Sequence, residues 1–160
     1  MSRAKSALSN LLLIAALLGA APAQADSALV TGQTLYVPAY SHIAYGSGKG
    51  SLRLRITLSL RNLDRTAPVT IIRVDAYDGA GTLVTEHLVE PVVLAPLASH
   101  EIALPETEAF VGGGGTSLIV TWTSAQPAAA PLVETVMIGT AGTQGISFVG
   151  RSRVLDEIGP

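Results

Sequence analysis

The stretch YVPAYSHIAYG, Tyr36 to Gly46, carries the side chains best suited to chemistry or recognition in this chain. It holds three of the 4 tyrosines and one of the 3 histidines in a sequence that is only 4% aromatic. In loops beside a rigid sheet such side chains often serve recognition, because each combines a large apolar area with a polar tip. They also suit a simple lid over the end of a core. The predicted ligand- or partner-binding residues are Tyr36, Tyr40, Ser41, His42, Tyr45 and, from a later segment, Glu134.

Ser41 and His42 place a nucleophile type beside a base type. Adjacent side chains on a strand point to opposite faces, so we expect no direct hydrogen bond between this hydroxyl and this imidazole. A second serine, Ser147, follows Gly145 in GISFVG, but it stands in a strand pattern and not at the sharp turn of a nucleophile elbow. Serine hydrolase chemistry is therefore not expected.

Paired carboxylates offer another route to hydrolysis, and Glu106 and Glu108 are the nearest local pair. They lie two residues apart in a segment flanked by proline and glycine, which is more typical of a solvated loop. A hydrolase with paired carboxylates is kept only as a last alternative. We predict a protein that is not an enzyme and has no catalytic residues.

The histidines offer a different chemistry, a copper or zinc site. His42, His87 and His100 are separated by 45 and 13 residues, which matches no local ligand motif. A β-sandwich brings distant residues together, so a periplasmic copper- or zinc-binding protein remains an alternative, with Met137 as a further ligand. The main prediction contains no metal and no cofactor.

Glu134 is unusual for its surroundings, because the segment PLVETVMIG is apolar at alternate positions on both faces. If the face of Glu134 is buried, the carboxylate must be paired. The candidate partners are a tyrosine hydroxyl, Arg53, Arg55 and Arg151. If Val133 and Met137 face inward instead, Glu134 lies in water. The periodicity leaves both phases open.

The first 25 residues are typical of an export signal. Arg3 and Lys5 precede the apolar run Leu11–Ala21, and Ala23–Ala25 gives a small-x-small cleavage pattern. The run is shorter than the about 20 apolar residues that a membrane-spanning helix needs. We predict a signal peptide at 1–25 and a periplasmic or secreted protein with no transmembrane segment in the mature chain. The mature part is one domain, residues 26–160, with its core at about 33–154.

Composition excludes two classes of function. The chain has 0 cysteines, so thiolate catalysis and thiolate metal sites are absent. All 12 acidic but only 8 of the 10 basic residues follow residue 25, so the mature net charge is −4. Nucleic-acid binding needs clustered basic residues, and these are scattered, as expected on solvated faces. The scattered residues are Arg53, Arg55, Arg61, Arg65 and Arg73. A charged fraction of 14%, against roughly 25% in typical domains, favours a surface covered by a protein partner or a second copy.

Alternation predicts an all-β domain. In LRLRITLSLRN, starting at Leu52, apolar residues alternate with arginine, threonine and serine, as in a strand with one buried face. VTIIRVDAY repeats the pattern and runs into Asp78–Gly81, which predicts a hairpin turn before TLVTEHLV. Further strands are expected at 35–37, 91–94, 100–104, 118–123, 132–138 and 146–149. The segment after Pro38 is expected to be irregular and both chain ends frayed. Eight or nine short strands favour an antiparallel β-sandwich, immunoglobulin-like in the broad sense.

Three blocks of the sequence resemble a family of exported bacterial proteins, domain-of-unknown-function family 3124. The blocks are LYVPAYSHIAYG, GGGGTSLIVTW and PLVETVMIGTAGTQGISFVGRSR, and the resemblance covers most of Gln33 to Val154. It implies a single small exported domain with no activity to transfer. It also places five residues in the family's signature blocks, as candidates for a shared surface: Tyr40, Ser41, His42, Glu134 and Gly145. The sequence thus predicts an exported, non-catalytic β-sandwich that binds or assembles with a partner.

Overall fold

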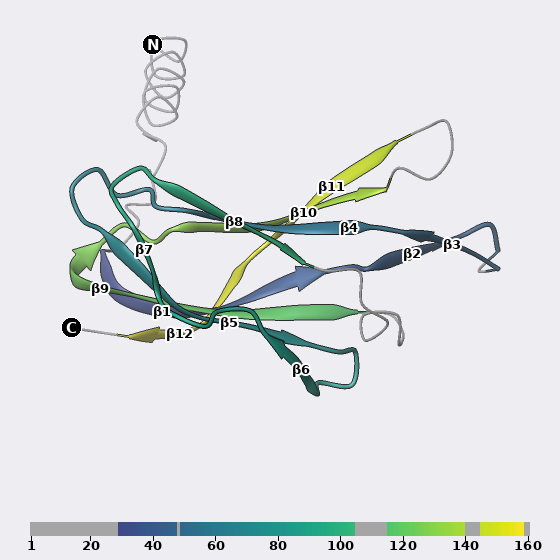
Figure 1. Ribbon diagram of the computed structural model, residues 1–160, viewed down its shortest axis with the longest axis horizontal. Helices are drawn as coiled ribbons and strands as arrows, with labels where there is room; N and C mark the ends of the chain where they lie inside the picture. Colours follow the sequence, from purple (N-terminus) through teal and green to yellow (C-terminus); the bar gives the residue numbers. More distant parts are fainter. Residues whose placement is uncertain (1–28, 48, 105–114, 140–144, 159–160) are drawn as a thin grey trace, which may run out of the picture.

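The computed structural model describes residues 29–47, 49–104, 115–139 and 145–158. The predicted signal peptide and the pair Glu106 and Glu108 lie outside these residues. Within the described ranges the chain forms twelve β-strands (Figure 1). No helix in this part of the chain has the length and hydropathy to cross a membrane.

The strands form two antiparallel sheets and a separate hairpin. Their bounds are β1 (Val30–Ala39), β2 (His42–Tyr45), β3 (Gly50–Arg53), β4 (Arg55–Arg61), β5 (Val69–Tyr77), β6 (Leu83–Glu86), β7 (Val92–Leu94), β8 (Ser99–Leu104), β9 (Thr116–Ala128), β10 (Leu132–Gly139), β11 (Ile146–Arg151) and β12 (Arg153–Ile158). The six-stranded sheet has the order β12-β1-β9-β5-β6, with β7 also paired to β5. The four-stranded sheet has the order β11-β10-β4-β8, and β2 pairs with β3. The predicted all-β sandwich is confirmed.

The core lies between the two sheets and follows the predicted alternation. On β4, Ile56, Leu58 and Leu60 are buried, whereas Arg55 and Arg61 are exposed. Across the core, Trp122 on β9 is fully buried with other apolar residues of the six-stranded sheet. The five arginines that were expected on solvated faces are all exposed. On β4, period-two patterning therefore decides which side of the strand faces the core.

Two segments expected to be irregular are strands. Residues after Pro38 form β2, which pairs with β3 and brings Ile43 opposite Leu52. The C-terminal segment forms β12, which pairs with β1, and the Thr31 hydroxyl donates a hydrogen bond to the Ile158 carbonyl at 2.8 Å. All six residues of β12 are exposed. Their sequence, RVLDEI, does not alternate between apolar and polar residues, so it does not predict a strand. Long-range pairing alone orders this segment.

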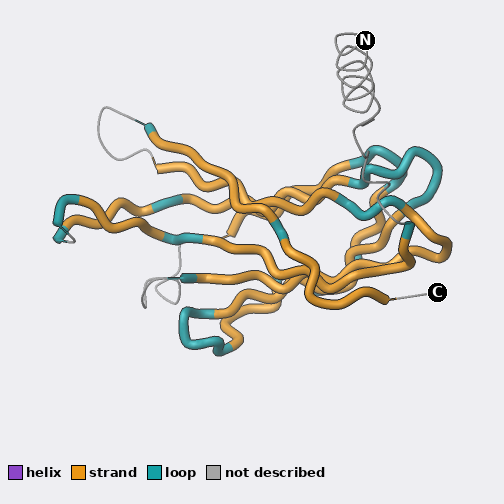
Figure 2. The backbone as a smooth tube through the Cα atoms, turned by 180° about the vertical axis from the view of Figure 1, so that it is seen from behind, coloured by secondary structure: helices purple, strands orange, loops and turns teal. Residues whose placement is uncertain are grey.

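The two ends of the sandwich differ. β1 begins and β12 ends at one end, together with the loops that join β4 to β5, β7 to β8 and β9 to β10 (Figure 1). Seen from behind, these loops gather close to the end of β12 (Figure 2). The opposite end carries the β2–β3 hairpin, the turn between β5 and β6, and the start of β9 (Figure 1). We call these the clasped end and the open end.

Candidate functional site

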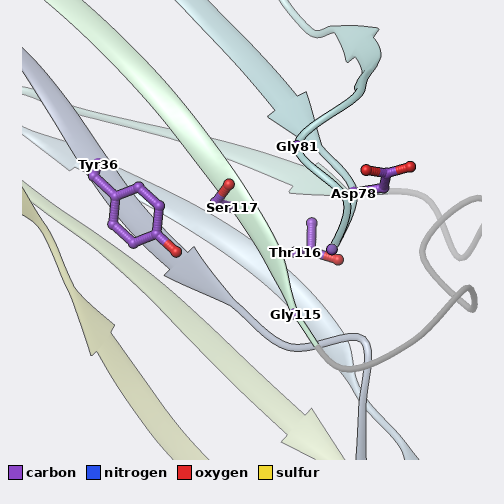
Figure 3. A pocket seen from close by; sticks show the side chains of 7 residues that line it. Tyr36, Asp78, Gly81, Gly115, Thr116 and Ser117 are labelled. Carbon is purple, nitrogen blue, oxygen red and sulfur yellow. The ribbon is translucent and has the colours of Figure 1, made fainter.

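A surface hollow of about 460 Å³ lies at the open end of the six-stranded sheet (Figure 3). Its lining comes from β1, from the turn between β5 and β6, and from the start of β9. The lining residues are Tyr36, Asp78, Gly79, Gly81, Gly115, Thr116 and Ser117. Its volume lies within the roughly 300–1,000 Å³ typical of small-ligand sites. We call this feature the Tyr36 hollow.

Tyr36 reaches the hollow because of the strand phase of β1. Leu35 and Val37 are buried in the core, so Tyr36 between them points outward and is 38% exposed. β1 lies between β12 and β9, which places Arg153 on one side of Tyr36 and Ile119 on the other. The aromatic ring is therefore fixed on a rigid central strand and presented on the outer face of the sheet.

The predicted hairpin turn forms the opposite wall of the hollow. The Asp78 Oδ1 atom accepts hydrogen bonds from the backbone N–H groups of Ala80 at 2.9 Å and Thr82 at 2.8 Å. The Gly81 N–H donates to the Asp78 carbonyl at 3.0 Å, and Gly81 has a φ of 82°, in the left-handed region that glycine adopts without a Cβ clash. A turn held by its own hydrogen bonds thus places its glycine backbone and a carboxylate across the hollow from Tyr36 (Figure 3).

Next to the hollow, the outer face of β5 carries an ordered polar group. Arg73 donates hydrogen bonds to the buried Asp75 carboxylate and, at 3.5 Å, to the Tyr77 hydroxyl. The bond to Asp75 raises the pKa of the Arg73 guanidinium. Tyr77 lies directly across from Ser117 of the hollow in the pairing of β5 with β9. The Arg73 guanidinium beside the hollow is therefore already neutralised by an internal partner.

Tyr40 lies apart from Tyr36 and closes the core instead. It follows the last residue of β1, and its ring packs on Phe148 with centroids 6.2 Å apart and planes tilted by 51°. Its backbone N–H donates to the sulfur of buried Met137 at 3.2 Å. Met137 is thereby a core residue with its sulfur occupied. Tyr40 acts as the lid that was one of the two expectations for this stretch.

The expectation for Ser41 and His42 is wrong. The Ser41 hydroxyl and His42 Nδ1 lie 3.2 Å apart, in hydrogen-bonding range. The alternation rule fails because Ser41 lies in a bend between β1 and β2, where its carbonyl also accepts a bond from the Leu54 N–H at 2.8 Å. Among the described residues no carboxylate is paired with His42, so the orienting acid of a hydrolytic triad is not found there.

Tyr45 is exposed on the β2–β3 hairpin and does not line the hollow. Its ring lies over Gly50 on β3, so close that a Cβ at that position would be only 2.6 Å from the ring. The predicted binding stretch is thus divided into three places. Tyr36 faces the hollow, Tyr40 covers the core, and Tyr45 covers a hairpin that extends past the sandwich (Figure 1).

Glu134 lies on the outer face of the four-stranded sheet. Val133 and Met137 are fully buried, which confirms the phase that turns Glu134 away from the core. Its side chain is 22% exposed, and Arg151, directly opposite on β11, brings its Nε atom to 3.8 Å from Oε1. Arg151 was one of the predicted partners. Glu134 does not line the hollow, which belongs to the other sheet.

The three histidines stand on separate elements. His42 is on β2, His87 follows β6, and His100 is on β8. No group of three or more histidine, aspartate or glutamate residues that could hold a metal occurs within the described ranges. Burial lowers the pKa of His87, whose buried Nε2 atom has no hydrogen-bond partner among the described residues. The convergence that the metal alternative required is not found in this part of the chain.

Residues 32–155 match the model of a family described as Protein of unknown function (DUF3124). The chain belongs to this family. This confirms the resemblance seen in the three sequence blocks. The chain is also similar to the crystal structure of Thermotoga maritima 1070. The similarity covers 80% of this chain and 94% of that chain, with a TM-score of 0.41 and 10% sequence identity. No curated protein matches the chain.

Most of the residues that line the hollow in this DUF3124 protein were not predicted as site residues. Asp78–Gly81 was predicted only as a turn, and Thr116 and Ser117 only as the approach to a strand. No local pattern could place them beside Tyr36, because β1 and β9 are about 80 residues apart along the chain. The one available signal was Tyr36 itself, an aromatic residue in an outward phase.

Proposed function

We propose that this protein is a non-catalytic binding module, exported to the periplasm or secreted, that recognises its ligand or partner at the Tyr36 hollow. The observation that carries the proposal is an exposed aromatic ring fixed on a central strand beside a ligand-sized hollow. Binding sites are concave and largely preformed, and rigid strands hold their side chains better than loops do.

The position of the hollow supports this proposal. It lies at the open end, whereas β1 begins and β12 ends at the clasped end (Figure 1). A domain tethered or extended at either chain end would keep the hollow accessible. β-sandwich binding domains often place their recognition residues at one end of the sandwich. The export part of the proposal rests on the sequence of residues 1–25.

Native mass spectrometry tests the proposal. The full chain would be expressed in a Gram-negative host and the processed protein taken from the periplasm, with N-terminal sequencing expected to begin at Asp26. We expect a bound mass or a defined complex that is lost in Tyr36→Ala and kept in Tyr45→Ala. Turnover of a substrate that disappears in His42→Ala, with the fold intact, would overturn the non-catalytic assignment.

A further inference from the structure

We propose that the Tyr36 hollow binds a neutral carbohydrate chain. This inference rests on the proposed function and names the chemical class of the ligand. It starts from the lining, which combines one aromatic ring, two small hydroxyl side chains, a carboxylate and glycine backbone. Sugars present hydroxyl groups around their rims and apolar C–H groups on their faces, so their recognition needs both kinds of partner at once.

The backbone of the hollow argues against an extended peptide as the ligand. A peptide adds to a sheet through an edge strand with unpaired N–H and C=O groups. β1 is paired on one side with β12 and on the other with β9, and β9 lies between β1 and β5. Over the paired residues, which on the β12 side of β1 end at Tyr36, neither strand offers a free edge. Recognition there must use side chains and the exposed β5–β6 turn.

The charges of the hollow argue against an anionic ligand. None of the lining residues is a lysine, arginine or histidine, and Asp78 supplies a negative charge. Arg73, on the adjacent strand, is bonded to Asp75. Among the described residues, an anion in the hollow would therefore meet a carboxylate and no cationic lining side chain, which disfavours it; the exposed Arg153, paired with Tyr36 on β12, does not line the hollow. A carboxylate accepts hydrogen bonds from neutral hydroxyl groups without this penalty.

The polar atoms of the hollow match a polyhydroxylated ligand. The Tyr36, Thr116 and Ser117 hydroxyls can each donate and accept a hydrogen bond. Asp78 uses its Oδ1 atom to hold the turn, and no bond to Oδ2 is found within the described residues. The Tyr36 ring, fixed by the strand phase, supplies an apolar face of the kind that packs on sugar C–H groups. Tyr77, across from Ser117, extends the aromatic surface.

Isothermal titration and 15N chemical-shift mapping test this inference. The probes are cellohexaose, maltohexaose and chitohexaose, each added to the processed full chain up to about 5 mM, a range that detects weak binding. We expect at least one to bind and to shift the amide signals of Tyr36, Asp78 and Ser117. Tyr36→Ala should weaken that binding by about tenfold or more, as expected for an aromatic anchor. Tyr36→Phe, which keeps the ring and removes the hydroxyl, should weaken it less.

Tyr45→Ala is the matched control, because Tyr45 is exposed and lies outside the hollow. It should leave affinity unchanged. Circular dichroism of each variant should show the same melting transition as wild type, because the Tyr36 side chain is partly exposed. A fall in affinity without unfolding therefore reports on the hollow itself.

Three results would overturn the carbohydrate assignment. The first is no binding of any probe. The second is binding that survives Tyr36→Ala and shifts residues elsewhere. The third is binding of polygalacturonate alone that is lost in Arg153→Ala, since that would show an anion site beside Tyr36.

A separate readout distinguishes failure of the ligand class from failure of the proposed function. p-Benzoylphenylalanine placed at position 36 reports any macromolecule seated at the hollow in the periplasm. A defined protein crosslink together with no sugar binding would overturn the carbohydrate and keep the binding module. No crosslink and no sugar binding would overturn both.

Discussion

The clasped end and the open end of the sandwich use polar side chains in opposite ways. At the clasped end, the buried Asn62 amide donates to the carbonyls of Ala67, Leu94 and Ala95 at 2.9, 3.2 and 3.1 Å. At the open end, Tyr36 and Ser117 of the hollow lie in the outward phase of their strands with at least partly exposed side chains, whereas Thr116 is buried. The buried amide joins the connection between β4 and β5 to that between β7 and β8, whereas the outward polar groups of the hollow remain accessible.

Asp64 makes further hydrogen bonds at the clasped end. Its Oδ1 atom accepts bonds from the N–H groups of Thr66 and Ala67, both at 2.8 Å, and its Oδ2 atom accepts one from Ala129 at 2.9 Å. These backbone bonds, that from Ala129 first, hold the pKa of the Asp64 carboxyl well below its ordinary value. The loop after β4 is thereby joined to the connection between β9 and β10. The side-chain bonds that join loops thus lie at the clasped end, away from the hollow that we propose for recognition.

The largest loss of stability is expected at the clasped end. Asn62→Ala removes the side-chain donor from the carbonyls of Ala67 and Leu94 and the acceptor of the Asp64 N–H, while the Ala95 carbonyl keeps its bond from the Ala98 N–H; each unpaired buried polar group costs about 1–3 kcal/mol. We expect the free energy of unfolding to fall by about 3 kcal/mol in urea denaturation. Ser124→Ala is the control, because it removes a single exposed bond to the Pro68 carbonyl and should change it by less than about 0.5 kcal/mol. Equal effects of the two would show that the buried bonds of Asn62 contribute no more than one exposed bond.

Asp64, at the clasped end, should also make stability depend on pH. Because folding lowers the pKa of Asp64, its stabilisation is complete above the ordinary value of 3.8 and is lost as pH falls below it. At neutral pH, the melting temperature of the wild type should be higher than that of Asp64→Asn, and both should be measured at a series of pH values. The gap should close in acid. A gap that stayed constant down to the lowest pH would contradict the role of the ionised carboxylate.

At the open end, Tyr40→Ala tests how much the lid contributes. The ring is 41% exposed and makes one tilted aromatic contact with Phe148, so we expect a loss of about 1–2 kcal/mol in urea denaturation. Tyr40→Phe keeps the ring and should be close to neutral. A loss as large as that of Asn62→Ala would show that the open end is as firmly held as the clasped end.

The smallest effect is expected on the outer face of the four-stranded sheet. Arg151→Gln removes the ion pair with Glu134, in which the arginine side chain is 85% exposed. Exposed pairs contribute about 0.2–1 kcal/mol, so the unfolding free energy should change by less than about 1 kcal/mol. High salt should reduce the difference further. A larger, salt-independent change would place Glu134 among the structural polar groups.

The candidate site was only partly predictable. The phase of β1 predicts that Tyr36 points away from the core, and the motif at Asp78 predicts a turn. That these two meet beside Ser117 depends on the pairing of β1 with β9 and of β9 with β5. Ser41 and His42 show the converse, because a bend replaces the strand that the alternation rule assumed.

The sequence by itself determined the fold class, the buried faces of the main strands, the turn at Asp78–Gly81 and the family. These follow from local alternation, turn chemistry and sequence blocks, which depend on residues close together along the chain. Only the tertiary structure decided that β12 is a strand, that Asn62 and Asp64 tie three loops, and that the Tyr36 hollow exists. Each of these depends on contacts between segments tens of residues apart, and a strand's choice of partner leaves little trace in its own sequence.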